Sequence, residues 1–290
     1  MFFDEEMLLD LRLNIMDKHV DKFVITEATY MHNGKSKKLT FDINKYSKFK
    51  DKIIYIVVDK NPPDIEKIND DDNEKIINSK MHSNAYKRHI YQLEQTHLGI
   101  KDAKSNDIII VSDLDEIPNL DYVDFKKVRE KLIFFKQKMF YYKLNLYYKM
   151  PWYGSRACKK KHFKSAKWLQ WIKNKKYPLW RLDIFFSNKK YNDICFVSNG
   201  GWHFTNIKSP EDIEKKLKSF VHYKDFETSG LSLNDLKNLI KEKKVMYNHS
   251  IDKKGNKWSD GERLQPLSLH EMPKYIVQNY EIYKPWLENI

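Results

Sequence analysis

Three short runs of apolar and mostly β-branched residues restrict the fold of this chain more than any other feature. They are Lys22–Ala28 (KFVITEA), Lys52–Asp59 (KIIYIVVD) and Asp107–Ser112 (DIIIVS). Strands whose consecutive residues are nearly all apolar are covered on both faces, as in the parallel sheets of α/β proteins. The three runs therefore predict buried strands.

Segments with helical periodicity alternate with these strands. Apolar residues recur at helical spacing from Asp4, a predicted N-cap, to about Val20, and a long helix is predicted over Glu74–His97, with Gly99 placed to close it. The order helix, strand, strand, helix, strand is typical of an α/β sheet, whose ligands bind beyond the carboxyl ends of the strands. We therefore predict a single α/β domain of 290 residues with a mixed central sheet flanked by helices.

The pattern changes after Pro118, which is expected to end the third strand. Phe140–Lys149 (FYYKLNLYYK) alternates like a strand with one exposed face, and Leu179–Phe186 and Asp193–Ser198 predict further short strands. The last third of the chain has helical patterns, so the predicted domain ends in a helical C-terminal region.

Composition excludes several other classes of protein. No window approaches the roughly 18 consecutive apolar residues of a membrane-spanning helix, and the N-terminus carries acids where a signal peptide has positive charge. A soluble, cytoplasmic chain without a membrane anchor is expected, with peripheral membrane contact left open. Cys158 and Cys195 are the only cysteines, which excludes a disulfide framework and a four-cysteine zinc site.

The formal net charge of +13 raises nucleic acid as a partner, because lysine-rich surfaces bind phosphate backbones. The lysines are spread along the whole chain, however, and the densest cluster is the short segment Arg156–Trp168. We interpret most of them as solvated surface and expect no nucleic-acid partner. A basic rim would equally suit an anionic small ligand such as a nucleotide diphosphate.

Three carboxylates directly follow the third predicted strand, in the sequence SDLDEIP. Asp113 and Asp115 project to the same side if the chain stays extended and come closer if it turns, and Glu116 is their neighbour. Mg²⁺ or Mn²⁺ binds carboxylate oxygens together with substrate phosphate oxygens, so the pair could hold a metal that in turn holds a diphosphate. The alternative is an acid-rich turn whose charges face water.

Three classes of enzyme use a comparable D-x-D pair. Phosphatases of the haloacid-dehalogenase type carry it after their first strand and follow it with a threonine-containing turn, where this chain has Glu116 and Ile117. Polymerase-type nucleotidyltransferases need a Gly-Ser pair shortly upstream, which is missing here. Sugar-nucleotide transferases combine βα units, then D-x-D, then an irregular acceptor-binding half, and this order fits. A D-x-D phosphatase and a basic polyanion-binding or nucleic-acid-binding protein stay as alternatives.

The sequence resembles glycosyltransferase family 17, the β-1,4-mannosyl-glycoprotein N-acetylglucosaminyltransferases, over nearly the whole chain. The segments that carry the resemblance are FFDEEMLLDLRLNIMDKHVDKFVITEAT, KIIYIVVD, NAYKRHI, IIIVSDLDEIPN, MFYYKLNLYY, GGWHFTNIKSPEDIEKKLKSFVH and HEMPKYIVQNY. D-x-D-E-I-P followed by G-G-W-H-F is the most specific combination.

This resemblance implies a GT-A (Rossmann-like) fold, with a nucleotide-sugar-binding half over residues 1–120 and an acceptor-binding half with C-terminal helices over residues 121–290. It also implies a UDP-sugar donor, UDP-N-acetylglucosamine (UDP-GlcNAc) in characterised enzymes, a divalent cation, Mn²⁺ or Mg²⁺, and transfer to a glycan hydroxyl with inversion to a β-linkage. The linkage, the oligomeric state and the acceptor, whether surface glycan, lipid-linked oligosaccharide or glycoprotein glycan, are not encoded in these motifs.

Residue by residue, the resemblance assigns Asp113 and Asp115 to the metal and donor motif. Glu27 and Arg88 match charged positions near the nucleotide crevice, and Arg88 would stabilise the leaving diphosphate unless it only forms a helix-surface salt bridge. His203 matches the aromatic motif and is a candidate ligand of the metal or the diphosphate, with acceptor contact and a core position as alternatives.

Aromatic residues near these motifs are candidates for stacking on the acceptor sugar, namely Trp202 with Trp152 and Tyr153. Aromatic residues are plentiful in this chain, so a core position is the favoured interpretation for each of them taken alone. Inversion also needs a carboxylate that accepts the proton of the acceptor hydroxyl. Asp183 is the first candidate for this base, Glu116 is the second, and a structural ion pair with Arg181 is the alternative role of Asp183.

Overall fold

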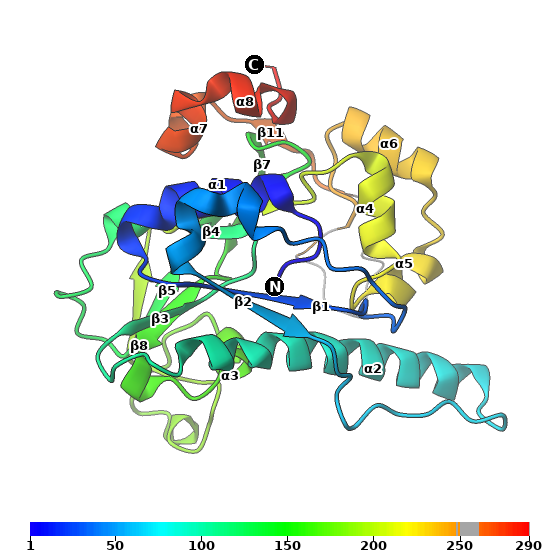
Figure 1. The fold of residues 1–290 in the computed structure, drawn as a ribbon, viewed down its shortest axis with the longest axis horizontal. Coiled ribbons are helices and arrows are strands. Elements are labelled where there is room, and N and C mark those ends of the chain that lie inside the picture. The colour runs from blue at the N-terminus through cyan, green and yellow to red at the C-terminus, as the bar shows by residue number, and fades with distance from the viewer. Residues whose placement is uncertain (248, 250–260, 290) are drawn as a thin grey trace.

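The structure is a computed structural model that describes residues 1–247, 249 and 261–289. Its first part follows the predicted order closely. Helix α1 (Glu6–Met16) precedes the parallel strands β1 (Phe23–Ala28) and β2 (Ile53–Val58), and the long helix α2 (Glu74–Glu94) follows. Figure 1 shows α1 and α2 on opposite sides of the β1–β2 pair. The predicted helix, strand, strand, helix order is therefore confirmed, with small shifts at the ends of elements.

Both helices differ from the prediction at one end. The N-cap of α1 is Glu5 rather than Asp4. Helix α2 ends at Glu94 and continues as a 3-10 helix over Gln95–Ile100, so that Gly99 lies within this tighter helix instead of closing α2. A Cβ at Gly99 would come within 2.6 Å of the Val24 side chain, so packing against β1 explains this glycine better than capping does.

The remaining strands form two mixed sheets, and the described residues do not join them and the β1–β2 pair into the one central sheet that was predicted. The four-stranded sheet has the order β3 (Ile108–Val111), β8 (Arg156–Lys159), β5 (Leu132–Phe135), β9 (Ile194–Val197). The five-stranded sheet has the order β11 (Gln265–Pro266), β7 (Leu146–Trp152), β6 (Gln137–Tyr141), β10 (Gly201–Thr205), β4 (Glu116–Pro118).

Along the described strands, the chain passes between these two sheets five times. The pairs β7 and β8, β5 and β6, and β9 and β10 are each consecutive along the chain, with one strand in each sheet. The order β8, β5, β9 across the first sheet matches the order β7, β6, β10 across the second. Strand β3 is different, because it pairs with β8 at one edge of the first sheet, whereas β4 pairs with β10 at the opposite edge of the second. The acidic turn between β3 and β4 therefore lies where the strand order of the molecule changes, the kind of position at which α/β folds bind ligands.

Three sequence predictions for strands need correction. The run Phe140–Lys149 is not one strand but parts of β6 and β7, because Tyr142 adopts a positive φ of 63° in the turn between them. Leu179–Phe186 is not a strand but a turn with a 3-10 helix at Leu182–Ile184, whose backbone N–H groups bond three residues back. Pro118 does not end the third predicted strand, because β3 already ends at Val111. It is instead the last residue of β4, an edge strand, where its missing N–H interrupts no hydrogen bonds between strands.

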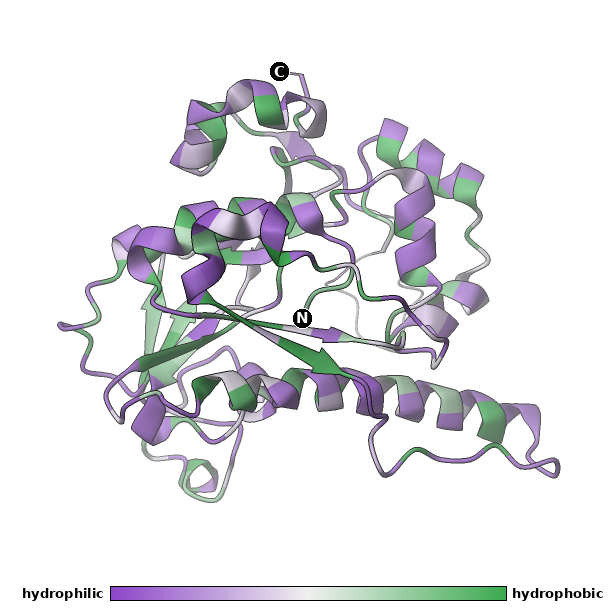
Figure 2. Cartoon of the chain, in the orientation of Figure 1, coloured by the Kyte–Doolittle hydropathy of each residue, from purple (hydrophilic) through white to green (hydrophobic). Residues whose placement is uncertain are grey.

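Helices pack around the sheets at both ends of the fold. They are α3 (Ala166–Trp171), α4 (Pro210–Leu217), α5 (Tyr223–Ser229), α6 (Leu233–Lys241), α7 (Lys274–Gln278) and α8 (Tyr280–Tyr283). The predicted strand at Asp193–Ser198 is confirmed by β9, and the predicted helical C-terminal region by α4 to α8. Figure 2 shows that helices α1 and α2 alternate hydrophilic and hydrophobic residues, whereas strand β2 is mostly hydrophobic.

The main core lies between α1, the strands and the C-terminal helices. Leu11, Phe135, Phe140, Phe204 and Ile276 are all fully buried in it. No helix in the described part of the chain is long and apolar enough to cross a membrane. The architecture is thus mixed α/β, and the compartment in which the protein works stays a prediction.

Candidate functional site

A cavity of about 870 Å³ lies beside the acidic turn. Both predicted halves of the chain contribute to its walls, which include the segment before α1, one face of α2, the ends of β7 and β10, and residues between α4 and α5. Five of the predicted site residues line it: Asp113, Asp115, Glu116, Trp152 and His203. The structure therefore brings Trp152 and His203, from distant parts of the chain, to the same cavity as the three acids of the turn.

The acidic turn is held in place by backbone contacts with α1 and β10. The half-buried Arg12 of α1 donates to the carbonyl oxygens of Asp113 (3.0 Å) and Glu116 (2.6 Å) and to the hydroxyl of Ser112 (2.5 Å). The N–H of Phe204 donates to the carbonyl of Asp115 at 2.8 Å. Because the backbone carbonyls accept these bonds, the three carboxylate side chains are left to face the cavity.

Asp115 lies between two cationic groups. Its Oδ1 is 3.7 Å from Nε2 of His203, and its Oδ2 is 3.9 Å from Nζ of Lys216 in α4. Burial alone would raise the pKa of Asp115, but His203 and then Lys216 lower it well below its usual range. Asp115 is therefore a carboxylate anion at any ordinary pH.

Glu116 is in the opposite electrostatic situation. Its side chain is buried, Oε1 accepts from Trp152 Nε1 at 2.5 Å, and Oε2 accepts from the N–H of Asp113 at 3.0 Å. Burial and the neighbouring charge of Asp113 raise the pKa of Glu116 to about 7. A Cβ at Gly154 would lie 1.7 Å from Oε1, so this position must be glycine for Glu116 to occupy its place.

His203 lies close enough to both Asp115 and Glu116 for their charges to act on its ring. Its ring stacks on Trp152 with centroids 4.8 Å apart, and its buried Nδ1 has no hydrogen-bond partner within the part of the chain that the structure describes. Burial lowers the pKa of His203, but Asp115 and then Glu116 outweigh this and raise it. These neighbours thus favour the protonated form of the ring beside Asp115, and among the roles predicted for His203 this form suits contact with an anion.

Another part of the cavity wall is formed by histidines and aromatic rings. His82, Tyr86 and His89 lie on one face of α2 at helical spacing, and His32 packs edge-on against both His89 (5.2 Å) and Phe220 (5.2 Å). Burial, and next the charge of His89, lower the pKa of His32 to about 3. His32 is therefore uncharged at neutral pH, and the rings of this wall can stack on a planar or ring-shaped ligand.

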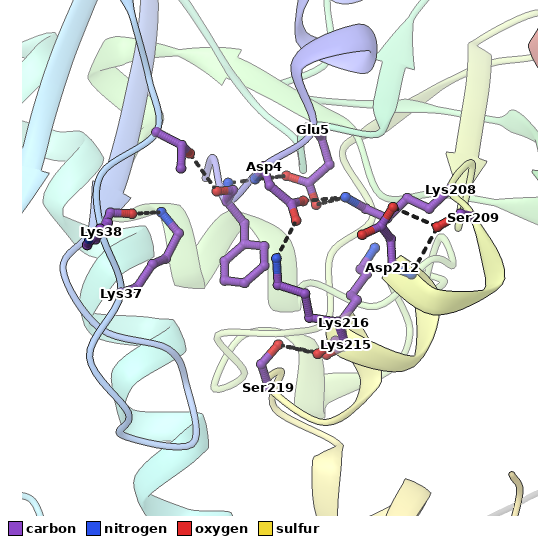
Figure 3. A network of polar contacts seen from close by, with 12 residues as sticks. Asp4, Glu5, Lys37, Lys38, Lys208, Ser209, Asp212, Lys215, Lys216 and Ser219 are labelled. Carbon is purple, nitrogen blue, oxygen red and sulfur yellow. Dashed lines mark hydrogen bonds and ion pairs between the residues drawn. The ribbon is translucent and has the colours of Figure 1, made fainter. Parts of the chain in front are cut away.

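Lysines of α4 and the loop before it bind the segment that precedes α1 (Figure 3). Lys208 forms an ion pair with Asp4 and lies 3.9 Å from Glu5, while Lys215 lies 3.9 Å from Asp4. Lys216, one residue further, points to Asp115 instead. These contacts tie the two predicted halves of the chain together across the mouth of the cavity.

Two predicted donor residues lie outside the lining of the cavity. Glu27 is fully buried in β1, where its carboxylate accepts from Lys37, from the N–H groups of Thr40 and Phe41, and from the Tyr55 hydroxyl. These bonds outweigh the effect of burial and lower the pKa of Glu27.

Arg88 of α2 is half-buried and does not line the cavity itself, but it contacts the segment around His32, which does. Its guanidinium donates to the carbonyl of His32 (3.2 Å) and to Asn61 (2.9 Å) and packs against Gly34. It thereby holds the segment that presents His32 to the cavity.

Three other candidates are not at the cavity. Trp202 is buried in the main core and donates from Nε1 to the carbonyl of Glu271 at 2.8 Å. Tyr153 packs edge-on against Phe196 in the core of the four-stranded sheet. Asp183 pairs with Arg181 (2.8 Å) and Lys190 (2.6 Å) in an exposed loop, and these partners lower its pKa to about 2.

Several contributors to the site escaped sequence reasoning. Arg12 holds the acidic turn although 101 residues separate it from Asp113, and no local pattern connects the two. Lys216, His89 and Phe220 were inside segments that carry the family resemblance, so their motifs were a usable signal even though the single residues were not selected.

The cavity offers carboxylate oxygens, which are the ligands that Mg²⁺ and Mn²⁺ prefer. Asp113 and Asp115 offer carboxylate oxygens at the cavity, and Asp113 is engaged only by Gln170 Nε2 at 3.4 Å among the side-chain bonds of the described residues. The described part of the chain holds no group of three or more His, Cys, Asp or Glu side chains arranged around one metal position. Mg²⁺ and Mn²⁺ at nucleotide sites often take one or two carboxylates, with phosphate and water as the other ligands, and two carboxylates fit that pattern.

Comparison with known proteins gives a consistent result. Residues 1–287 match glycosyltransferase family 17. The chain is 24% identical to the β-1,4-mannosyl-glycoprotein 4-β-N-acetylglucosaminyltransferase of Rattus norvegicus and 23% identical to those of Mus musculus and Homo sapiens, over 97% of this chain in each case.

The chain spans about half the length of these curated relatives, 52% for the rat and mouse proteins and 53% for the human one. No solved structure matches it significantly.

Proposed function

The chain belongs to glycosyltransferase family 17, and from this premise we propose that it transfers a sugar from a nucleotide donor to a hydroxyl group of a glycan acceptor. UDP-GlcNAc is the donor that we propose, because the relatives named above are N-acetylglucosaminyltransferases. The proposed fold is of the GT-A type, with the donor bound where β3 gives way to β4.

One observation carries this proposal. Asp113 and Asp115 line the same cavity as Lys216 and His203, so that carboxylates suited to a cation and groups suited to an anion meet in one place. A sugar diphosphate with its divalent cation has this combination of charges. A turn whose acids merely face water would not bring two cationic side chains from distant elements to one of them.

We propose that Asp113 and Asp115 hold Mn²⁺ or Mg²⁺ together with the diphosphate. The cation would act as a Lewis acid that offsets the negative charge on the departing UDP. Lys216 and His203 would bind the same phosphates and stabilise the charge that develops on them, which lowers the barrier if they interact more strongly with the transition state than with the bound donor.

The aromatic and histidine wall of the cavity suits the nucleoside. His89 and Tyr86 of α2, with His32 and Phe220, offer ring faces and edges to the cavity. We propose that uracil packs here, and that Arg88 supports this wall through its bond to the His32 carbonyl instead of touching the phosphate. Trp152, which lines the cavity beside Glu116, is the proposed aromatic contact for a sugar ring.

Inversion by direct displacement requires a base that accepts the proton of the acceptor hydroxyl. Of the two carboxylates considered, Glu116 lines the cavity next to Trp152, whereas Asp183 is engaged by Arg181 and Lys190 away from it. We therefore propose Glu116 as the base. Its burial keeps water from competing for the proton, and Trp152 fixes the orientation of the carboxylate.

The proposal is tested by a panel of nucleotide sugars. Purified protein with Mn²⁺ is expected to hydrolyse UDP-GlcNAc slowly in the absence of acceptor and faster than the corresponding GDP-sugars and CMP-sugars. Asp115→Ala should lose this hydrolysis while still unfolding in one cooperative transition above the assay temperature.

Two results would replace the proposal with one of its alternatives. Cleavage of a generic phosphate ester that Asp113→Asn removes would indicate a phosphatase. Salt-sensitive binding of DNA or RNA, without any response to nucleotide sugars, would indicate a polyanion-binding protein.

A further inference from the structure

A loop over residues 173–191 exposes an unusual group of large apolar side chains. Leu179, Trp180, Leu182, Phe185 and Phe186 are each between 65% and 91% exposed. The loop projects from the body of the molecule next to α3 (Figure 1). Single exposed apolar residues are common, but five within eight consecutive positions form a patch that a protein surface rarely presents without a use.

Backbone hydrogen bonds join the two ends of the loop, so the patch lies on a segment with a defined conformation. The N–H of Lys173 donates to the carbonyl of Lys189 at 2.7 Å, and the N–H of Tyr177 donates to the carbonyl of Tyr191 at 3.0 Å. Nearer the tip, Asp183 accepts from both Arg181 and Lys190. Internal bonds therefore occupy the polar groups, whereas the apolar side chains at the tip point outward.

Positive charge surrounds this patch. The same loop carries six basic residues and one acid, Asp183: the basic residues are Lys173, Lys175, Lys176, Arg181, Lys189 and Lys190. The basic cluster Arg156–Trp168 is linked to it through Lys164, whose Nζ donates to Asn188 at 3.3 Å. The only carboxylate of the loop is thus neutralised internally. Of the remaining basic residues, Lys176 lies 3.8 Å from Glu130, and Lys173, Lys175 and Lys189 are exposed.

We propose that this loop docks the protein on a membrane surface that carries anionic lipid headgroups. Trp and Phe side chains insert favourably at the boundary between headgroups and acyl chains, and Lys and Arg around them bind anionic headgroups. The five apolar side chains at the tip match the first requirement, and the basic residues at its flanks match the second. This inference does not depend on the proposed activity.

Two other occupants fit the patch less well. A second copy of the chain would bring two strongly positive loops together, which opposes self-association. Single-stranded nucleic acid could stack on Trp180 and Phe186, but Leu179 and Leu182 have no ring to stack and would stay in water. In a bilayer all five side chains leave water together.

Docking through this loop would also fix the position of the cavity relative to the membrane. Helix α3 leads directly into the loop, and Gln170 near its end donates to Asp113 at 3.4 Å. One short helix therefore connects the membrane-facing patch to the acidic turn. An acceptor presented at the bilayer surface would be within reach of a cavity held in this way.

The inference is tested by co-sedimentation of the full chain with vesicles. Vesicles of phosphatidylcholine with phosphatidylglycerol should bind the protein, pure phosphatidylcholine vesicles should bind it much less, and rising salt should weaken the binding. The double variant Trp180→Ala/Phe186→Ala should bind the anionic vesicles at least about tenfold more weakly, because two aromatic side chains no longer leave water.

A matched control is available elsewhere on the surface. Ile282 and Tyr122 are 66% and 63% exposed but lie outside the loop, so Ile282→Ala/Tyr122→Ala should keep full vesicle binding. Equal melting temperatures of both double variants would show that neither is misfolded. Trp180→Phe should retain binding but remove part of the fluorescence quenching by bromolipid.

Three results would overturn the inference. They are absence of wild-type binding to anionic vesicles, equal vesicle binding by the two double variants, and a preference for a single-stranded oligonucleotide that Trp180→Ala/Phe186→Ala abolishes. Self-association that the same variant removes, without vesicle binding, would likewise assign the patch to a second copy.

Discussion

Glu27 in β1 and Glu116 in the turn after β3 are both buried glutamates, but their surroundings shift their pKa values in opposite directions. Glu27 accepts bonds from Lys37, from two backbone N–H groups and from Tyr55, which lower its pKa. Glu116 is surrounded by further acids, and burial with the charge of Asp113 raises its pKa to about 7. The first arrangement favours the charged form, and the second makes it costly.

This difference separates a structural carboxylate from the one that we propose to be functional. The bonds to Glu27 fasten the segment around Thr40 to β1, and its oxygens are already occupied. The acids of the turn face a cavity, where a cation and a diphosphate could relieve their repulsion. Groups whose pKa values are shifted by burial and like charges gather at functional sites, so Glu116 and not Glu27 is the residue to test for chemistry.

The largest expected effect is on catalysis. Glu116→Gln should lower kcat by about 10²–10⁴-fold, the usual contribution of a general base. Donor affinity should change little, because the amide keeps the shape of the side chain. Asp183→Asn serves as the control and should turn over near-normally, since Arg181 and Lys190 hold Asp183 away from the cavity. A loss in Asp183→Asn with normal Glu116→Gln turnover would reverse the assignment.

A large effect on folding is expected at the other glutamate. Glu27→Ala leaves the buried ammonium of Lys37 and the donors of Thr40 and Tyr55 without their partner, which should lower the free energy of unfolding by about 3–5 kcal/mol. Urea denaturation measures this value. Activity per folded molecule should survive, and an inactive but fully stable Glu27→Ala protein would assign Glu27 to the site after all.

The two regions should also give opposite dependences of stability on pH, measured without metal in the presence of a chelator. The lowered pKa of Glu27 means that its stabilisation is present above the unfolded pKa of about 4.3 and is lost as the pH falls through the folded value. The raised pKa of Glu116 means that the folded protein loses stability as the pH rises from about 4.3 to about 7.

Melting temperatures of Glu27→Gln and Glu116→Gln between about pH 2 and pH 8, relative to wild type, separate these contributions. The deficit of Glu27→Gln should shrink toward low pH, and Glu116→Gln should gain relative stability toward high pH. Parallel curves for the two variants would mean that the carboxylates do not differ as described.

The smallest effect is expected from Trp152→Phe. The indole N–H of Trp152 donates to Glu116, and this bond lowers the pKa of the carboxyl group. Its loss should raise that pKa, so the rising limb of the pH profile of kcat/KM should move to higher pH by about one unit. An unchanged limb would show that the activity does not report on Glu116.

The sequence predicted the elements that depend on local pattern. Apolar runs located β1, β2 and β3, and the acids after β3 marked the site. The turn at Tyr142 was missed because a positive φ is rare for an aromatic residue, so nothing in the sequence marks it. The exposed segment at Leu182–Ile184 was mistaken for a strand, since its apolar residues suggested burial that does not occur.

Within the site, the sequence identified motifs better than individual side chains. Trp202 and His203 are consecutive in β10, so their side chains leave opposite faces of the sheet, and only His203 reaches the cavity. Arg12 lies within a segment that carries the family resemblance, but it could not be connected to the acidic turn, because its partners are 101 and 104 residues away along the chain. Pairings of this kind depend on the assembled fold.

The central claim is that Asp113 and Asp115 hold a sugar nucleotide through a divalent cation, and the binding of UDP measures it most directly. UDP with Mn²⁺ should raise the melting temperature of the wild-type protein, whereas UDP or Mn²⁺ alone should raise it much less. Asp115→Ala should abolish the joint effect. A shift that is equally large without Mn²⁺, or one that persists in Asp115→Ala, would contradict the account.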